Sequence, residues 1–309
     1  MSGSKQEGAK TAVIVLNWNS REMTAECIGS LLRMRGGDYQ VLVVDNGSRD
    51  GSVEYLRREF PRVAVLPQKR NLGFAAGCNV GIKEGLKQGA KYVLPINNDT
   101  VVDVRFLEEL VSAADRHPQA AMISPKIYFG DAPDILWWAG GAFNLWSGIP
   151  KMIGRKERDG GQFDAERPID WATGCAALIR CEVLKEIGLF DERFFGNGED
   201  LDLSVRMRRA GYEVWFAPGS KLWHKEGVDY RKNVGEQMRK FTGTRNSLYL
   251  MYKHAGPLQW LSFAPNFLVR HVFPYIALSL VRADFRSAWA VVRGLGAFPA
   301  MIYREKRGA

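Results

Sequence analysis

The first 125 residues alternate short apolar runs with segments of helical periodicity. The apolar runs predict strands at 11–17, 39–46, 63–67, 91–97 and 120–125, and the periodic segments predict helices at 20–35, 53–60, 75–87 and 105–116. Runs that are apolar on both faces and separated by helices are typical of a parallel sheet covered on both sides. The pattern therefore predicts an α/β fold, Rossmann-like, with a doubly wound, mostly parallel sheet.

The pattern becomes irregular between residues 126 and 170. This part is rich in glycine and tryptophan, and we expect irregular strands or a hairpin that covers the crevice at the edge of the sheet. Tryptophan in such a segment fits sugar binding and core packing equally well. Beyond it the sequence predicts a strand at 171–180, a short helix at 181–188, a helix that begins at Glu199 and a strand at 213–218.

Polar residues follow four successive strands of the predicted sheet. These residues are Asn17–Asn19, Asp45–Ser48, Lys69–Asn71 and Asn97–Asp99. A single Asn or Asp at such a place is most often a helix cap. Ligands of doubly wound sheets, however, bind beyond the carboxyl ends of the strands. Four polar ends on one edge therefore favour a polar binding crevice.

The crevice is expected to combine acids with cations. The acids are Asp45, Asp99, Glu199, Asp200 and Asp202, and the cations are Lys69, Arg70, His224 and Arg245. Such a mixture suits a nucleotide diphosphate with a divalent metal, and a carboxylate free of metal can accept a proton from an attacking hydroxyl. Acids that open a helix and bases that close it also suit the helix dipole, so the helix that begins at Glu199 has a structural explanation too.

The basic charge is concentrated near the end of the chain. The formal net charge is +9, and the seven basic and two acidic residues after Gly256 supply five of these charges. Between residues 258 and 298 the basic residues stand among aromatic and aliphatic ones, which suits helices in the interface of a membrane. A helical cap on the main domain is the alternative. No clean apolar run of about 20 residues is present, so a transmembrane helix is not expected.

The remaining composition points to a cytoplasmic protein. The four cysteines form no CxxC pair, which predicts reduced thiols and no zinc site. The N-terminus lacks the charged and apolar pattern of a signal peptide, and its small polar residues predict a flexible segment at 1–10.

Five segments, in order, resemble the bacterial family 2 glycosyltransferases of GT-A fold, and most closely a rhamnosyltransferase-like subgroup. The segments are VIVLNWN, VLVVDNGSRDGS, NLGFAAGCNVGI, INNDT and GLFDERFFGNGEDLDLSVRMRRAGYEV. The resemblance implies an inverting enzyme of cell-surface polysaccharide synthesis that moves a sugar, with rhamnose favoured, from a nucleotide diphosphate. It covers a transferase domain at 11–254, with a nucleotide-binding half at 11–125 and an acceptor half at 126–254, followed by amphipathic, membrane-associating helices at 255–309.

The resemblance also implies a role for individual residues. The implied donor-binding residues are Asn17, Asp45, Arg70, Asn71, Gly77, Asn79, Asn97, Asn98, Asp99 and Arg245. The implied acceptor-binding residues are Trp171, Gly174 and Glu199. INND matches the DxD motif, with Asn97 in the first acidic place, so Asp99 with His224 is expected to bind Mg²⁺ or Mn²⁺. The GED segment gives Asp200 as the general base, assisted by Glu199.

Other protein classes fit the sequence less well. A sugar nucleotidyltransferase needs a glycine-rich loop where NWNSREM stands, and a hydride-transferring enzyme needs GxGxxG, whereas Gly73, Gly77 and Gly81 have the spacing of a helix packed closely on a sheet. An inert nucleotide-sugar-binding protein or a membrane scaffold of the same fold is the remaining alternative. The expected partners are a dTDP-, UDP- or GDP-linked sugar, a glycan or polyprenyl-diphosphate-linked acceptor, and an anionic membrane surface on the inner face of the cell membrane, but no nucleic acid.

Overall fold

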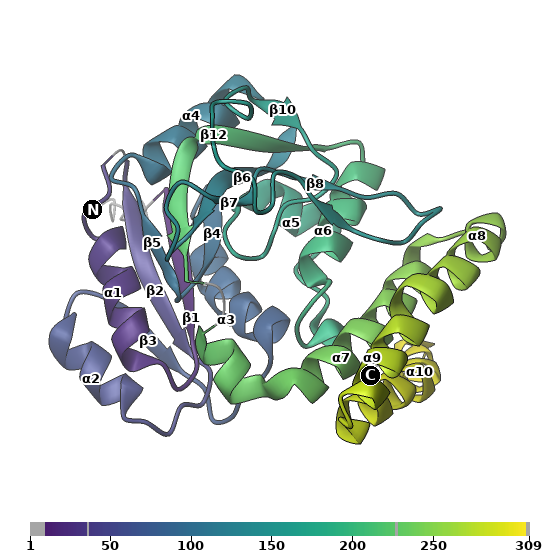
Figure 1. Ribbon diagram of the computed structural model, residues 1–309. Coiled ribbons are helices and arrows are strands. Elements are labelled where there is room, and N and C mark those ends of the chain that lie inside the picture. Colours follow the sequence, from purple (N-terminus) through teal and green to yellow (C-terminus); the bar gives the residue numbers. More distant parts are fainter. Residues whose placement is uncertain (1–9, 36, 226–227, 307–309) are drawn as a thin grey trace.

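The computed structural model describes residues 10–35, 37–225 and 228–306, with the side chains of 228–234 and 304–306 left aside. The flexible segment predicted at the N-terminus thus lies outside the described residues, apart from Lys10. Helices cover both faces of one large sheet, and further helices extend from it at the C-terminal end (Figure 1). The strand order is β10-β12-β6-β11-β4-β1-β2-β3, with β5 paired to β12 and β7 to β6.

The first four strands of the sheet are parallel, as the sequence predicts. They are β1 (Thr11–Asn17), β2 (Tyr39–Asp45), β3 (Ala64–Pro67) and β4 (Tyr92–Asn97). Asn17 lies opposite Asp45, and Leu16 lies opposite Asn97 in the neighbouring pair. Because these strands end level with one another, their polar ends lie side by side at one edge.

The helices that follow these strands along the chain also agree with the prediction, within a few residues at their ends. They are α1 (Arg21–Leu31), α2 (Ser52–Glu59), α3 (Phe74–Lys87) and α4 (Phe106–Arg116). A Cβ atom on Gly77 or Gly81 would lie 2.5 Å from Leu16 or 2.4 Å from Ile14, closer than side-chain atoms approach. These glycines therefore let α3 pack closely on β1, as their spacing predicts.

The second half of the sheet is mixed. Its main strands are β6 (Ala120–Phe129), β11 (Leu178–Arg180) and β12 (Glu213–His224). β11 runs antiparallel between β4 and β6, while β12 is parallel to β6. The sequence predicted a strand only at 213–218, but the register shift between Ala217 and Lys221 lets the chain continue as one strand to His224.

Short elements complete the α/β part. They are β5 (Thr100–Val102), β7 (Leu136–Trp138), β8 (Gly141–Ala142), β9 (Lys151–Met152), β10 (Arg167–Pro168), α5 (Cys181–Ile187), a 3₁₀ turn η1 (Glu192–Phe194) and α6 (Glu199–Arg209). The irregular strands predicted for 126–170 are thus confirmed. The strand predicted at 171–180 is wrong for its first part, because the chain turns at Gly174 and Cys175 and forms a continuous strand only at Leu178–Arg180.

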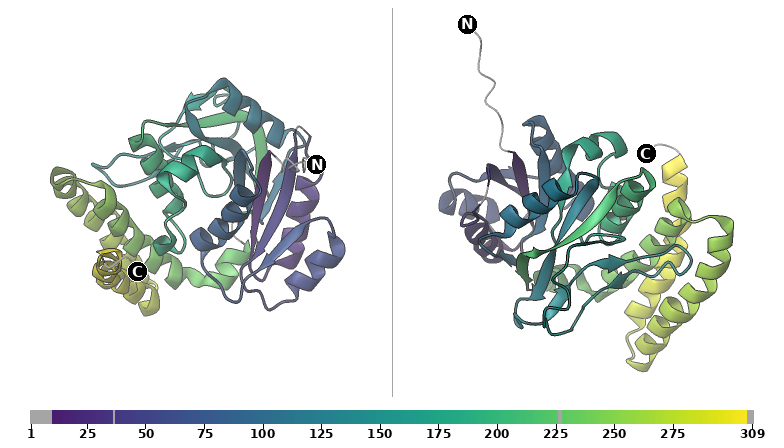
Figure 2. Two further views of the ribbon diagram at one scale, coloured as in Figure 1. Left: turned by 180° about the vertical axis from the view of Figure 1, so that it is seen from behind. Right: turned by 90° about the horizontal axis from the view of Figure 1, so that it is seen from above.

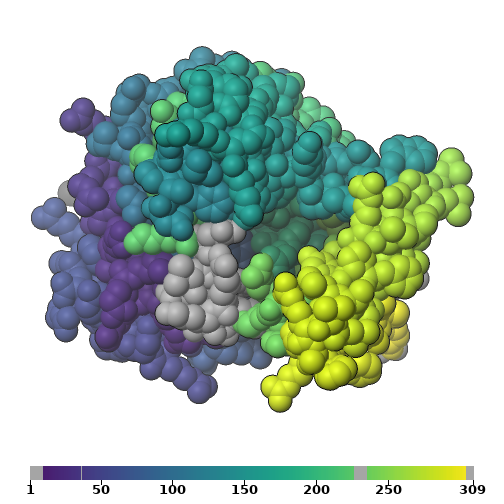
Figure 3. Space-filling model, viewed as in Figure 1, coloured from purple at the N-terminus to yellow at the C-terminus, as the bar shows by residue number. Residues whose placement is uncertain are grey.

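The chain continues with α7 (Val228–His254), α8 (Pro257–Phe267), a π-helical turn η2 (Leu268–Val272), α9 (Phe273–Val281) and α10 (Phe285–Lys306). The helices α8, α9 and α10 lie together at one end of the molecule, and α7 leads from the sheet to them (Figure 2, Figure 3). α7 bends at Gly235, where φ is 72° and ψ is 157°. Within the described residues, no helix combines the length and the apolar character needed to cross a membrane.

Candidate active site

A chain of hydrogen bonds links the ends of β1, β2 and β4. Asn17 Nδ2 donates to Asp45 Oδ2 (2.7 Å), and Asn17 Oδ1 accepts from Thr24 Oγ1 (2.7 Å). Thr24 Oγ1 in turn accepts from Asn98 Nδ2 (2.9 Å). Asn17 and Asp45 are buried, so this network fixes their orientation. The sequence predicted that these strand ends meet, but the connecting role of Thr24 is visible only in the structure.

The turn after β2 packs against the segment that leads into α3. Asn46 Nδ2 donates to Asn71 Oδ1 (3.0 Å), and Asn46 Oδ1 accepts from Leu72 N (2.9 Å). A Cβ on Gly47, whose φ is 78°, would lie 2.6 Å from the backbone of Arg70. The close approach holds Asn71 in place and leaves the side chain of Arg70 exposed beside the strand ends.

Asp99 and His224 form a buried pair between β4 and β12. Asp99 Oδ1 lies 3.1 Å from His224 Nε2. Burial favours the neutral imidazole, but the Cys175 sulfur and the Asp99 carboxylate stabilise the protonated ring, and the pKa of His224 lies well above its ordinary value. A cation bound here would replace that proton, so the pair has the electrostatics of a cation site.

This pair could hold a divalent metal only with further ligands from a bound sugar nucleotide. Among residues 10–35, 37–225 and 228–306, no group of three or more His, Cys, Asp or Glu side chains could hold a metal ion. Mg²⁺, however, is commonly held by one or two carboxylates together with substrate phosphates and water. Asp99 and His224 therefore fit a metal whose remaining ligands come from a bound diphosphate.

Asp200 and Glu199 open α6 close to the same edge. Asp200 Oδ2 accepts from Gly174 N (2.7 Å), and Oδ1 accepts from Leu201 N (2.8 Å). Since Cys175 O accepts from Asn97 N, the segment at 174–175 connects Asp200 to the end of β4. We call Asn17, Asp45, Asn98, Asp99 and Asp200 the polar edge, because these contacts run continuously along it.

The two adjacent carboxyls differ in their surroundings. Burial, reinforced by the charges of Asp200 and Asp202, raises the pKa of Glu199 to about 8. Burial also raises the pKa of Asp200, although the backbone N–H groups of Gly174 and Leu201 oppose that rise. Glu199 Oε2 is buried and makes no hydrogen bond within the part of the chain that the structure describes. The pair thus offers one neutral and one ionisable group near neutral pH.

The loop before Glu199 has a strained backbone. Phe195 and Asn197 have φ values of 62° and 70°, in the left-handed region that side chains rarely adopt. Asn246 Nδ2 on α7 lies 2.9, 2.8 and 2.7 Å from the carbonyl oxygens of Phe194, Gly196 and Asn197. This single amide therefore holds the loop that carries the two carboxyls.

Arg245 also contacts this loop. Its Nη2 donates to Phe194 O at 3.1 Å, and its Nε donates to Asn246 Oδ1 at 2.9 Å. The structure therefore places Arg245 with the loop that precedes Glu199, and its predicted contact with a diphosphate stays a prediction.

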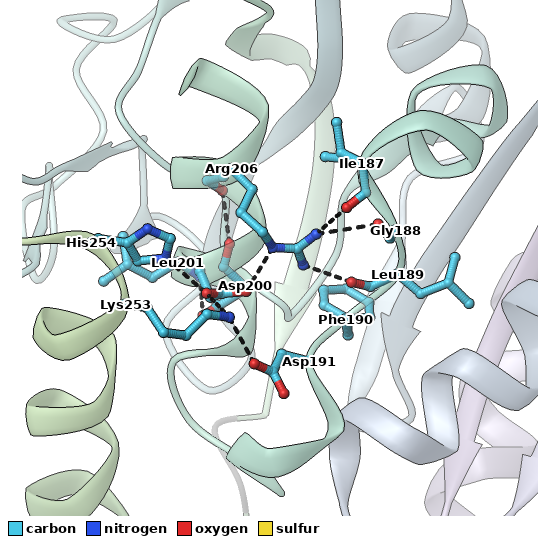
Figure 4. Close-up of polar contacts among 12 residues, drawn as sticks. Ile187, Gly188, Leu189, Phe190, Asp191, Asp200, Leu201, Arg206, Lys253 and His254 are labelled. Atoms are coloured by element: carbon cyan, nitrogen blue, oxygen red, sulfur yellow. Dashed lines mark hydrogen bonds and ion pairs between the residues drawn. The ribbon is translucent and has the colours of Figure 1, made fainter. Parts of the chain in front are cut away.

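Asp202 does not belong to the crevice, contrary to the sequence-based expectation. Its carboxylate lies 2.9 Å from Arg206 Nε, 2.6 Å from Lys253 Nζ and 2.8 Å from His254 Nε2. Figure 4 shows these three partners, of which Lys253 and His254 belong to α7. Burial opposes ionisation, but the hydrogen bond from His254 and the charges of Lys253 and Arg206 hold the pKa of Asp202 well below its usual range. The carboxylate is therefore structural.

Three further predicted residues are committed to packing. Asn79 is buried and exchanges hydrogen bonds with the backbone of Phe190 (2.9 and 3.2 Å). Trp171 is buried edge-on against Trp138, with ring centroids 4.7 Å apart. Gly77 faces β1. Direct contacts of these residues with donor or acceptor stay predictions.

Comparison with known proteins agrees with this geometry. Residues 12–188 match the family described as "Glycosyl transferase family 2". The chain is 27% identical, over 71% of its length and 78% of the other, to an N-acetylglucosaminyl-diphospho-decaprenol L-rhamnosyltransferase of Mycobacterium tuberculosis. It is 26% identical, over 91% and 92% of the two chains, to the galactofuranosyltransferase GlfT1 of the same organism.

Solved structures show the same fold. A mannosyltransferase from Pyrobaculum calidifontis, in complex with GDP-Man and Mn²⁺, superposes with a TM-score of 0.59 at 13% identity, over 96% of this chain and 89% of the other. GalNAc-T7 with UDP, GalNAc and Mn²⁺ also gives a TM-score of 0.59, at 16% identity, over 86% and 58% of the chains. The sheet, the polar edge and the matched residues together show that the chain has the GT-A fold and belongs to glycosyl transferase family 2.

Proposed function

We propose that the protein is an inverting glycosyltransferase that moves a sugar from a nucleoside diphosphate to a hydroxyl of a lipid-linked glycan. The observation that supports the proposal is the polar edge: the side chains that we assign to nucleoside binding, diphosphate binding and proton acceptance follow one another beyond the parallel strands. Rhamnose is the favoured sugar and dTDP the favoured nucleotide, in agreement with the rhamnosyltransferase among the relatives. UDP- and GDP-linked sugars are the alternatives.

Asn17 and Asp45 hold the nucleoside in this proposal. The buried Asp45 presents a carboxylate that suits the N–H groups of a pyrimidine or purine base. The exposed guanidinium of Arg70, beside Asn71, extends towards the phosphates, where its planar donors suit phosphate oxygens. A divalent cation held by Asp99 and His224 would neutralise charge on the diphosphate when bound.

Asp200 acts as the general base. It accepts the proton of the acceptor hydroxyl while the hydroxyl oxygen bonds to the anomeric carbon, and the bond from that carbon to the diphosphate oxygen breaks with its electron pair on the nucleoside diphosphate. The N–H groups of Gly174 and Leu201 orient the carboxylate, and its raised pKa brings its basicity nearer to neutral pH. Attack opposite to the leaving group inverts the anomeric centre.

Glu199 assists with the acceptor. With a pKa of about 8, its carboxyl is protonated at neutral pH and can donate a hydrogen bond to an acceptor oxygen. The neutral form also avoids a second negative charge next to Asp200, which would otherwise oppose the approach of a diphosphate.

The C-terminal helices place the enzyme at a membrane surface in this proposal. The exposed side of α8, α9 and α10 carries large apolar residues, among them Leu261, Val281 and Phe285. Exposed arginines lie between them, as is typical of helices in an anionic membrane interface. A lipid-linked acceptor at the inner face of the cell membrane would then lie within reach of the enzyme.

Nucleotide binding tests the proposed function most directly. We expect one of dTDP, UDP and GDP to raise the melting temperature of the purified protein clearly more than the other two. Mn²⁺ should enlarge that shift, and Asp99→Ala should abolish the enlargement, since it removes the carboxylate that would share the cation with the diphosphate. Identical melting curves with all nucleotides would overturn the proposal.

A second variant separates binding from chemistry. Asp200→Asn should lower the rate of transfer, or of slow donor hydrolysis, by about 10²- to 10⁴-fold and leave the nucleotide-induced shift unchanged. Asp115→Asn, which removes an exposed aspartate on α4, serves as the matched control and should retain full activity. A wild-type protein that binds the donor sugar nucleotide but never hydrolyses or transfers it would instead be an inert binding protein.

A further inference from the structure

A cavity of about 400 Å³ lies between α7 and α10. It is lined by Gln237, Met238, Phe241, Arg286, Trp289, Ala290 and Arg293, none of which belongs to the polar edge. The α10 residues Arg286, Trp289, Ala290 and Arg293 stand at positions i, i+3, i+4 and i+7, so they share one helix face over two turns. The cavity is thus a regular feature of the packing of these two helices rather than an irregular gap.

The charge of the cavity is positive. No carboxylate lines it, and neither Arg286 nor Arg293 forms an ion pair within the described ranges of the chain. Asp284 interacts electrostatically with Arg286, whose charge helps to stabilise the Asp284 carboxylate. That carboxylate accepts a hydrogen bond from Ser287 N (3.1 Å) at the start of α10. Two guanidinium groups facing one space suit a phosphate or a diphosphate, whose oxygens can pair with their planar donors.

The rest of the lining is apolar. The side chains of Met238 and Trp289 are 43% and 61% exposed, and Arg293 Cζ lies 5.5 Å from the centre of the Phe241 ring. A soluble anion gains nothing from such surfaces, whereas a phosphate attached to a hydrocarbon chain gains from both kinds of contact. Phe285, the residue before Arg286, is also exposed and adds apolar surface to this end of α10.

The cavity also adjoins the loop that leads to the carboxyls. The centre of the Phe241 ring also lies 5.3 Å from Arg245 Cζ, and Arg245 contacts Phe194 O. Thr242, the residue after Phe241, accepts a hydrogen bond at Oγ1 from Asn197 Nδ2 (3.3 Å). A ligand in the cavity would therefore touch the same helix that holds the loop before Glu199.

We propose that this cavity binds the phosphate headgroup and the first isoprenoid units of the lipid-linked acceptor. Arg286 and Arg293 pair with the phosphates, and Met238 and Trp289 contact the chain. The inference rests on the proposed function, because it assigns a place to the acceptor of that reaction.

Farnesyl diphosphate is a suitable probe for the full-length protein, with inorganic pyrophosphate as the headgroup alone. We expect farnesyl diphosphate to bind at least about tenfold more tightly than pyrophosphate, measured by calorimetry. The double variant Arg286→Gln with Arg293→Gln should bind farnesyl diphosphate at least about tenfold more weakly, as expected from the loss of charge-assisted hydrogen bonds. The matched control, Arg270→Gln with Arg282→Gln, removes the same charge from exposed positions outside the cavity and should bind normally.

Trp289→Ala provides a variant at an exposed position whose folding is not at stake. It should weaken the binding of farnesyl diphosphate and leave the binding of pyrophosphate unchanged. Vesicles of phosphatidylcholine with phosphatidylglycerol should not displace bound farnesyl diphosphate. Equal losses in both double variants, equal affinity for the two probes, or displacement by the vesicles would each overturn the proposal. The nucleotide-induced melting shift is recorded for every variant: it should not change, and its absence from the wild type would count against the proposed function instead.

Discussion

Glu199 and Asp200 show how neighbouring carboxyls acquire different chemistry from their surroundings. Asp200 receives two backbone hydrogen bonds, which stabilise its anion. Glu199 is buried next to that anion with Oε2 unpaired within the residues described, and its pKa rises to about 8. The difference follows from where the backbone N–H groups point, which the letters GED alone do not reveal.

This environment predicts a pH-dependent contribution of Glu199 to stability. Its pKa is raised from an ordinary value of 4.5 to about 8, so between these values the folded protein binds more protons than the unfolded chain. The free energy of unfolding must then fall as the pH rises through that window. The side chain of the Glu199→Gln variant cannot ionise, so its stability should not show this fall. Between pH 5 and pH 9 the free energy of unfolding of the variant should therefore rise, relative to that of the wild type, by on the order of 3 kcal/mol.

Denaturant unfolding at pH 5, 7 and 9 measures this difference. Glu182→Gln, at an exposed position of α5, removes a carboxylate without burial and should differ from the wild type by the same amount at each pH. A Glu199→Gln variant that also keeps a constant difference would show that the Glu199 carboxyl ionises normally in the folded protein.

At the scale of elements, α7 organises the acidic end of α6 from two sides. Asn246 holds the loop before Glu199. His254 lies one helix turn after Leu250 and two turns after Asn246, and it forms a hydrogen bond with Asp202 of α6. Lys253 bridges Asp191 (2.7 Å) and Asp202 (2.6 Å), so the loop and the helix are tied to each other as well (Figure 4). The position of Asp200 therefore depends on residues of α7 that lie more than 40 positions further along the chain.

Asn246→Ala tests this dependence. The variant leaves three loop carbonyls without their shared donor and allows Phe195 and Asn197 to leave the left-handed region. We expect a loss of about 2–3 kcal/mol in stability and a fall in kcat of about 10- to 100-fold, with nucleotide affinity unchanged. Hydrogen exchange should rise in the loop at 193–198 and not in the strands of the sheet.

Ser247→Ala is the matched control on the next residue of α7. The Ser247 hydroxyl donates only to Gly243 O of its own helix (2.8 Å), so its loss should leave both kcat and the loop unaffected. Should both variants reduce kcat equally, α7 would act through its general stability rather than through the Asn246 amide.

Elements that follow from local patterns were predictable from the sequence, and those that depend on distant partners were not. Strand ends such as Asn17 and Asp45 could be aligned because parallel strands have a regular register. The glycines of α3 could be assigned from their spacing alone. The structural role of Asp202 could not be predicted, because its partners Lys253 and His254 lie about 50 residues away in another helix. Trp171 was equally undetermined, since burial depends on the packing of Trp138.

At the scale of the whole molecule, charge and exposed apolar surface coincide on the C-terminal helices. Leu258, Leu261, Val269, Val281 and Phe285 are among the most exposed large apolar side chains, and all belong to α8, η2, α9 or α10. The same helices carry much of the net charge of +9. Monomeric proteins rarely expose contiguous apolar patches of this kind without a partner.

Vesicle binding tests whether a membrane is that partner. The full-length protein should float with vesicles that contain phosphatidylglycerol, and less so with pure phosphatidylcholine or in high salt, because arginines and apolar residues both contribute. Leu261→Asp and Val281→Asp change side chains that are 74% and 85% exposed, so they should not disturb the fold. Each should reduce the bound fraction at least about tenfold, as expected from the loss of one buried aliphatic side chain and the added charge. Leu32→Asp, on an exposed leucine directly after α1, is the matched control and should bind like the wild type. If all three variants bind equally well, the exposed face of the C-terminal helices is not the surface that meets the lipid.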